Sequence, residues 1–173
     1  NIQDGTIKKK ITTGSGSADS PNGLSSPTLL DVNRDGMADY AYAGDIDGNL
    51  WKFNLNSDDP DDWDEAYNRP LHPGLSTQPI TMAPVVALHP DRGYLVFFAT
   101  GRLFISLDAS DSSVQALYGI WDNGTTPPDS DSQSLLSQNI KAGSYTSGDI
   151  TETIHYYSPD AGDVDWSAQH GWK

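Results

Sequence analysis

The sequence predicts an all-β protein made of β-propeller blades joined by long loops, and three observations support this prediction. Segments that alternate apolar and polar residues are short, and no stretch of 12 or more residues carries a helical apolar stripe. The 16 glycines and 11 prolines indicate many turns, and the five Trp, eight Tyr and four Phe favour strands. An Asp-Gly turn before a strand-like segment occurs at Asp4-Gly5 and again, 43 residues later, at Asp47-Gly48. This offset is close to the ~40–50 residues of one propeller blade.

The predicted strands follow one another with turn-rich segments between them. We expect them at residues 6–12, 28–30, 40–44, 49–55, 79–88, 94–99, 103–107, 115–121 and 151–157, with loops at 14–27, 31–39, 56–75 and 122–149. One helical turn is expected at 61–67. In the segment 49–55, Leu50 and Lys52 share one face, while Trp51, Phe53 and Leu55 share the other. Residues 1–173 are expected to form part of one propeller domain, with about three to four blades, which cannot close a ring alone.

Composition excludes several classes of function. With 24 acidic and 10 basic residues, the formal net charge of −14 argues against binding to nucleic acids or to anionic membrane surfaces. No run reaches the ~18 apolar residues of a transmembrane helix, so no membrane insertion is expected. The absence of cysteine excludes disulfides and thiolate zinc sites. The chain begins at Asn1 without a signal segment and ends abruptly at Lys173, so we interpret it as an excerpt of a longer chain.

The sharpest chemical signal is a loop with oxygen-bearing residues at alternate positions. Its candidate calcium ligands are Asp31, Asn33, Asp35, the backbone carbonyl of Met37, and Asp39, with Gly36 at the sharp turn. The twelfth position, where a helix–loop–helix site has Glu, is Tyr42, and no helix flanks the loop. The pattern therefore predicts a calcium site between two strands, with Asp39 as a direct ligand. Carboxylates crowded into nine residues repel one another without a cation, and magnesium usually keeps more waters than this ligand set allows.

Simpler interpretations remain open for the acidic segments. The loop at 31–39 is alternatively a plain polar turn, because Asp, Asn and Gly favour turns. Asp45 and Asp47 are candidates for a second ion, but a hairpin turn explains them better. The acidic stretch 57–65 has irregular spacing and is interpreted as a solvated loop.

Three blocks of the sequence carry a resemblance to a known family. They are residues 24–27 with 31–39 and 42–53, residues 98–103 with Asp108, Asp111, Gln115 and 118–122, and Gly171-Trp172, which resembles the start of a third block. Together these blocks resemble the C-terminal β-propeller of PilY/PilC-type type IV pilus tip proteins. The similarity covers roughly residues 20–122 and the last few.

This resemblance implies a bacterial surface protein, at the pilus tip or outer membrane. It implies that the protein is not an enzyme, opposes pilus retraction, and supports pilus biogenesis, twitching motility and adhesion. The implied partners are the pilus machinery and minor pilins, with a host or surface receptor bound through the parent protein. The family's calcium loop corresponds to Asp31, Asn33, Asp35, Met37 and Asp39, and calcium there is linked to the control of retraction.

Two other classes of function compete with this one. A fragment of a quinoprotein-like propeller enzyme would explain the Asp-Gly-x-Leu-Trp turn that ends at Trp51, but no Arg, Asp, Glu and Trp cluster suggests a quinone site. His72, His89, His155 and His170 are scattered and lack zinc-ligand spacing. A generic calcium-stabilised extracellular binding module is the third hypothesis. Trp51, Phe53, Tyr118 and Trp121 are expected to be structural rather than ligand-binding.

Overall fold

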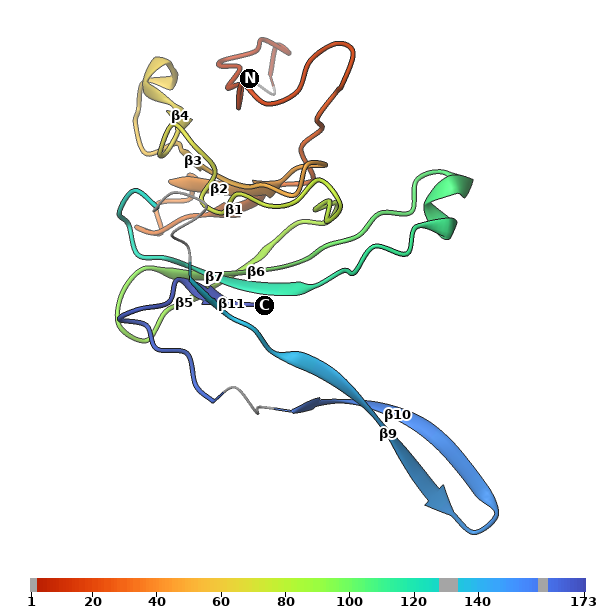
Figure 1. Cartoon of the computed structure of the whole chain (residues 1–173). Coiled ribbons are helices and arrows are strands. Elements are labelled where there is room, and N and C mark those ends of the chain that lie inside the picture. Colours follow the sequence, from red (N-terminus) through yellow and green to blue (C-terminus); the bar gives the residue numbers. More distant parts are fainter. Residues whose placement is uncertain (1–2, 128–133, 159–161) are drawn as a thin grey trace.

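A computed structural model describes residues 3–127, 134–158 and 162–173 of the chain. The described part is almost entirely strand and loop. Two sheets face each other, and a long hairpin extends away from them (Figure 1). The fold is all-β, as the sequence predicts.

The first sheet contains four antiparallel strands in the order β1-β2-β3-β4. These are β1 (Thr28–Leu30), β2 (Tyr40–Gly44), β3 (Leu50–Asn54) and β4 (Asp64–Glu65). In the β2–β3 hairpin, Gly44 pairs with Leu50 across the tight turn that the Asp-Gly signal predicts.

The second sheet contains five strands in the order β5-β6-β7-β11-β8. These are β5 (Val85–Leu88), β6 (Tyr94–Ala99), β7 (Leu117–Asp122), β8 (Leu135–Leu136) and β11 (Gly171–Trp172). All pairs are antiparallel except β11 with β8, which is parallel. Residues near the C-terminus thus return to the middle of this sheet and separate β7 from β8.

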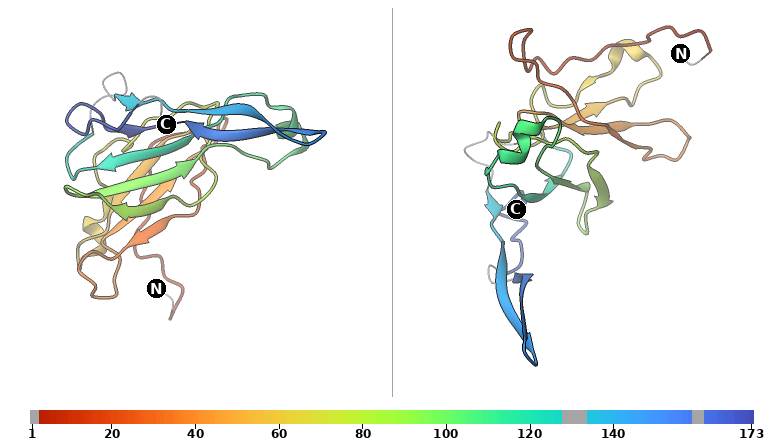
Figure 2. Two further views of the ribbon diagram at one scale, coloured as in Figure 1. Left: turned by 90° about the horizontal axis from the view of Figure 1, so that it is seen from below. Right: turned by 90° about the vertical axis from the view of Figure 1, so that its right-hand side faces the viewer.

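The remaining elements lie outside the two sheets. β9 (Asn139–Ser147) and β10 (Ile150–Ser158) pair along their full length and form the hairpin that projects from the body (Figure 2). The 3-10 helix η1 (Pro60–Asp62) precedes β4, and the 3-10 helix η2 (Ser106–Ser110) lies in the long connection between β6 and β7. Neither of these described helices is long and apolar enough to cross a membrane.

One apolar cluster joins the two sheets. Its buried members are Tyr42, Leu50, Leu71, Ile80, Val96, Phe98, Tyr118 and Ile120, drawn from β2, β3, β6, β7 and the connection between the sheets. Phe98 and Tyr118 stack within it, with ring centroids 4.9 Å apart. Burial of such side chains stabilises the folded chain by about 1.5–3 kcal/mol each, so this interface holds the sheets together.

The first sheet is also covered on its other face. Ala41, Ala43, Trp51 and Phe53 form a second buried cluster there, against which Ile11 and Leu55 pack. The alternation predicted for 49–55 is confirmed, because Leu50 belongs to the inter-sheet cluster and Trp51 and Phe53 belong to this one. Both faces of β3 are therefore buried, as in a strand that lies between two packed layers.

Several sequence expectations about elements were wrong, and packing explains them. Residues 6–12 form no strand, since they join no ladder with another described strand. Segment 103–107, expected to be a strand, runs into η2 instead. There the carboxylate of Asp108 accepts hydrogen bonds from the backbone N–H groups of Phe104 and Ile105. The helical turn expected at 61–67 occurs earlier, at Pro60–Asp62, and β4 follows it.

The segment 122–149, expected to be a loop, contains two strands. β8 pairs with β11, and β9 pairs with β10. In 79–88, only Val85–Leu88 pairs with a neighbour to form a strand. Gly171-Trp172 adds to the second sheet as β11. The expected count of three to four blades stays a prediction.

Gly44 marks the closest approach between the sheet and the connection that follows it. A Cβ atom at this position would collide with the branched side chain of Ile80. We predict that Gly44→Ala lowers the free energy of unfolding by about 1–3 kcal/mol, the usual cost of overpacking. Urea denaturation measures this loss.

Gly23→Ala is the matched control, because a Cβ there would meet only Ile46 at 3.6 Å, an ordinary contact. Equal stability of the Gly44→Ala and Gly23→Ala proteins would contradict the tight packing of Gly44 on Ile80.

Candidate calcium-binding loop and the buried ion pair

The candidate calcium loop connects β1 to β2, and the strand ladder fixes its two ends. Leu30 pairs with Tyr40, and the backbone N–H of Asp39 donates to the carbonyl of Leu30 at 2.8 Å. The loop thus leaves the sheet and returns to it at one place, so all predicted ligands belong to one strand–loop–strand unit. No helix flanks it among the described residues.

Within the loop, side-chain oxygens accept the backbone amides of later loop residues. Asp31 accepts the N–H groups of Arg34 (2.6 Å) and Gly36 (2.9 Å), and Asn33 accepts that of Asp35 (2.9 Å). Asp35 in turn accepts the N–H of Met37 (2.8 Å). The tight winding requires positive φ angles of 64° at Arg34 and 91° at Gly36. At Gly36, the glycine adopts this angle at no steric cost.

Asp39 lies at the junction of the loop with the sheet. Asp39 is only 6% exposed, and its Oδ2 accepts hydrogen bonds from the backbone N–H groups of Val32 (2.6 Å) and Asn33 (3.3 Å). Its carbonyl accepts the N–H of Leu55, from the segment after β3, at 2.8 Å. Asp39 therefore ties the loop to both neighbouring strands.

The donor chemistry of the loop fits calcium, which prefers carboxylate, amide and carbonyl oxygens. Met37 is 61% exposed, and because its thioether offers no oxygen, its predicted ligand is its backbone carbonyl. Among the residues that the structure describes, however, no three His, Cys, Asp or Glu side chains converge in the arrangement of a metal centre. The carboxylates instead accept loop amides, and the calcium site stays a prediction based on donor type and spacing.

The second candidate ion site is a hydrogen-bonded hairpin turn. Asp45 is 1% exposed, and its carboxylate accepts the Trp51 indole N–H (2.7 Å), the Asn49 amide (2.8 Å) and the Asn22 side chain (2.9 Å). The backbone N–H of Asp47 donates to Asn22 Oδ1. The contacts support the hairpin-turn interpretation and give Trp51 the structural role expected of it.

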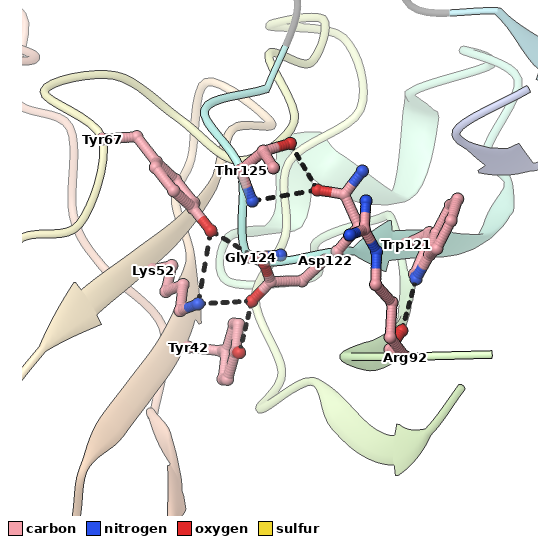
Figure 3. A network of polar contacts seen from close by, with 9 residues as sticks. Tyr42, Lys52, Tyr67, Arg92, Trp121, Asp122, Gly124 and Thr125 are labelled. Atoms are coloured by element: carbon pink, nitrogen blue, oxygen red, sulfur yellow. Dashed lines mark hydrogen bonds and ion pairs between the residues drawn. The ribbon is translucent and has the colours of Figure 1, made fainter. Parts of the chain in front are cut away.

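A buried ion pair between the sheets is the main feature that sequence reasoning missed. Lys52 Nζ lies 2.7 Å from Asp122 Oδ2, and the two residues are 5% and 1% exposed. The hydroxyls of Tyr42 (2.6 Å) and Tyr67 (2.8 Å) donate to the same carboxylate, as Figure 3 shows. The backbone N–H of Gly124 adds a further donor at 3.1 Å.

Aromatic rings surround the ammonium group of this pair. Lys52 Nζ lies 4.2 Å from the ring centroid of Tyr40 and 5.3 Å from that of Tyr67. These faces stabilise the cation in a site without bulk water. One sequence signal could have revealed the pair, because Lys52 shares its strand face with the buried Leu50 and a buried lysine needs a carboxylate.

The surroundings of Asp122 control its protonation. Burial raises the pKa of Asp122, but the Lys52 ammonium and the hydroxyl donors Tyr42 and Tyr67 outweigh burial and hold this pKa below its ordinary value. Burial, followed by the nearby carboxylate, raises the pKa of Tyr42 and Tyr67 far above the usual tyrosine range. The carboxylate therefore stays charged and both hydroxyls stay protonated at neutral pH.

Among the described residues, no histidine belongs to a group of three or more His, Cys, Asp or Glu side chains that could hold a metal ion. His89 is 5% exposed and stacks on Trp121, with centroids 4.4 Å apart, while Trp166 meets it edge-on at 4.6 Å. His72 lies 5.2 Å from the Tyr118 ring. The side chain of His155 lies outside the described atoms. Tyr118 and Trp121 thus have packing roles, as expected.

Comparison with known proteins decides which family the chain belongs to. The family model of the PilY1 beta-propeller domain matches residues 1–146. This chain belongs to that family. The match includes the candidate calcium loop, both partners of the buried ion pair, and the strands β1–β7.

Relatives and a solved structure agree with the assignment. The chain is 43% identical over 148 residues to the type IV pilus biogenesis factor PilY1 of Pseudomonas aeruginosa strain PAO1, covering 72% of the chain and 13% of that protein. It is 34% identical over 161 residues to a PilY1 homolog of Xylella fastidiosa strain Temecula1, covering 87% of the chain and 10% of the homolog. The chain therefore spans only a small part of these relatives.

The crystal structure of the P. aeruginosa PilY1 C-terminal domain resembles 99% of this chain with a TM-score of 0.73 and 33% identity. The match covers 42% of that domain. The β-propeller fold predicted from the sequence is thereby confirmed, and the chain corresponds to a part of such a propeller.

We predict that Lys52→Met lowers the free energy of unfolding by about 3–5 kcal/mol, because it leaves the buried Asp122 carboxylate without its counter-ion. Thermal or urea unfolding measures the loss. Lys10→Met, which removes an exposed lysine, should change little. The double change Lys52→Met with Asp122→Leu should recover much of the loss, and failure of Lys52→Met to destabilise would contradict the role of the pair.

The pH dependence of stability should report the same carboxylate. The pKa of Asp122 is lower in the folded chain than its ordinary value of ~3.9, so the unfolded chain binds more protons in acid. Its stabilising contribution is complete above about pH 4 and is lost as pH falls through the folded-state pKa. Urea midpoints of the wild type should therefore drop more steeply below about pH 4 than those of Asp122→Asn. If the urea midpoints of the two proteins fell equally steeply below about pH 4, that result would be inconsistent with a depressed pKa at Asp122.

Proposed function

We propose that this chain is a calcium-binding propeller segment of a type IV pilus biogenesis factor, which acts by binding and not by catalysis. The observation that carries the proposal is the family match over residues 1–146 together with relatives named as such factors. The proposed role includes opposing pilus retraction, which supports twitching motility and surface adhesion.

The loop of residues 31–39 supports the calcium part of this proposal. Its oxygen donors alternate along one strand–loop–strand unit whose ends are fixed by the β1–β2 ladder. Calcium at Asp31, Asn33, Asp35, the Met37 carbonyl and Asp39 would offset the repulsion of three carboxylates in nine residues. The ion would thereby stabilise the start of β2, which contributes Tyr42 to the inter-sheet cluster.

The proposed location and partners follow from the relatives and not from the geometry. The proposed location is outside the cytoplasm, at the pilus tip or outer membrane of a bacterium. Its proposed partners are the pilus machinery and minor pilins, and the parent protein is proposed to contact a host or surface receptor.

The described residues offer nothing that favours the enzyme alternative. A cavity of about 620 Å³ beside the candidate loop is lined by no Arg, Glu or His within the described chain. Trp51 belongs to the turn that resembles a quinoprotein motif, and its indole N–H donates to the Asp45 carboxylate at 2.7 Å. Buried Trp51 and Asp45 hold the hairpin, which supports a scaffolding role for the motif.

Calcium titration tests the proposal. Binding to the folded state should stabilise the protein by about 2.7 kcal/mol at a hundredfold excess of calcium over Kd. We expect calorimetric heat and a raised melting temperature for the wild type and neither for Asp35→Ala or Asp39→Ala. In the bacterium that encodes the chain, Asp35→Ala in the full-length protein should reduce surface pili and twitching.

Asp61→Ala is the matched control, since it removes a carboxylate from the other acidic loop without touching residues 31–39. Equal calcium heats for wild type and Asp35→Ala would place the ion elsewhere. Clear binding with unchanged pili and twitching would limit the ion to a structural role.

A further inference from the structure

Residues 6–12 are a strand-like segment that no described sheet includes. Burial alternates along the segment, because Lys9, Ile11 and Thr13 are partly buried and the residues between them are exposed. Among the described residues, none forms a hydrogen bond with a backbone group of residues 7–12. The segment thus alternates like a strand, but these backbone groups lack the partners that a sheet would provide.

We propose that residues 6–12 form a central strand of the preceding propeller blade and pair, in the full-length protein, with the parent-chain segment directly before the Asp4-Gly5 turn. Most of that segment lies outside this sequence. The family model of the propeller domain includes residues 6–12, and the chain covers only 13% of P. aeruginosa PilY1, so a protein of that length has further segments to supply strands. The proposal concerns the assembly of the propeller and does not depend on calcium binding or on a role in pilus retraction.

The first argument is that the segment begins as β3 does. Asp4-Gly5 precedes residues 6–12, and Asp47-Gly48 precedes β3 at an offset of 43 residues. Both glycines have positive φ angles, 72° at Gly5 and 86° at Gly48, which permit a tight turn. β3 pairs with β2 along one edge and with β4 along the other. At the same offset, the equivalent of β2 falls directly before the Asp4-Gly5 turn.

The second argument is the agreement in residue type along the two segments. At the 43-residue offset, Ile7 corresponds to Leu50 and Lys9 to Lys52. Leu50 belongs to the inter-sheet cluster, and Lys52 shares its strand face. An apolar residue and a lysine therefore occupy the same face in both segments, which is the face that β3 turns toward the following sheet.

Residues 6–12 also lie on the first sheet in the way that the first sheet lies on the second. Ile11 packs against the second buried cluster, on the face of β3 opposite the inter-sheet cluster. Lys9 Nζ donates to the carbonyl of Asp61, in η1, at 2.9 Å. Figure 1 shows the N-terminal part of the chain on the side of the first sheet away from the second. The segment therefore occupies the place of a strand in a further layer.

Ile7 is the third argument. It is 83% exposed, although Leu50, at the equivalent position of β3, is completely buried. The difference follows from the pairing of β3 on both edges, which holds its side chains against the neighbouring sheet. Pairing of residues 6–12 into a sheet would hold the start of the segment against the first sheet and cover Ile7.

Hydrogen–deuterium exchange of the full-length protein tests the inference. The amides of residues 7–12 should exchange more than about a hundredfold more slowly than those of the loop 14–22. Consecutive amides should be protected, because a central strand bonds to neighbours on both edges. Exchange as fast as in the loop would overturn the inference, and protection of alternate amides alone would contradict a central strand.

Two substitutions at Lys10 separate backbone pairing from side-chain effects. The Lys10 side chain is exposed, so Lys10→Ala keeps the backbone N–H and should leave the exchange of residues 7–12 slow. Lys10→Pro removes that N–H and should return the rest of the segment to the exchange rate of the loop, because a central strand does not tolerate proline. Equal exchange in the two variants would count against a paired strand.

Photo-crosslinking of the full-length protein with Lys10→p-benzoylphenylalanine identifies the paired segment. The equivalent residue of β3, Phe53, pairs with Ala41 of β2. We therefore expect the crosslinked peptide to come from the parent-chain residues directly before the Asp4-Gly5 turn. A crosslink to another part of the parent chain, or to a separate protein, would overturn the proposed pairing.

Discussion

The ion pair between Lys52 and Asp122 is the interaction on which the arrangement of the two sheets depends. It joins β3 to the end of β7, and Tyr42 from β2 donates to the same carboxylate (Figure 3). An apolar interface alone tolerates sliding, whereas a buried charge with four donors has one geometry that satisfies it. The pair thus fixes the register between sheets that burial holds together.

The position of the candidate loop depends on this arrangement of the sheets. Tyr42 lies three residues beyond Asp39 on the same chain, and β2 is held between the inter-sheet cluster and the cluster of Trp51 and Phe53. The loop is therefore joined to β2 and, through Tyr42, to Asp122.

The sequence predicted the parts of the fold whose causes are local. The alternation of 49–55 and the Asp-Gly turn define β3 and its hairpin with β2, and both were correct. Residues 6–12 are equally strand-like but pair with no described strand, so propensity did not decide their structure. Likewise, β8 and β11 are two-residue strands that exist only because each pairs with a distant segment. Nothing in their own sequences encodes that pairing.

The same distinction separates the two charged sites. The loop of residues 31–39 is visible in sequence because its ligands lie within nine residues, and its internal hydrogen bonds depend on spacing alone. Asp122 and Lys52 are 70 residues apart, and only the folded chain brings them together. Trp63 and Asp39 are likewise distant in sequence and meet around one cavity. Local spacing therefore makes a set of candidate ligands visible in the sequence, while the partner of a buried charge follows from the packing of distant segments.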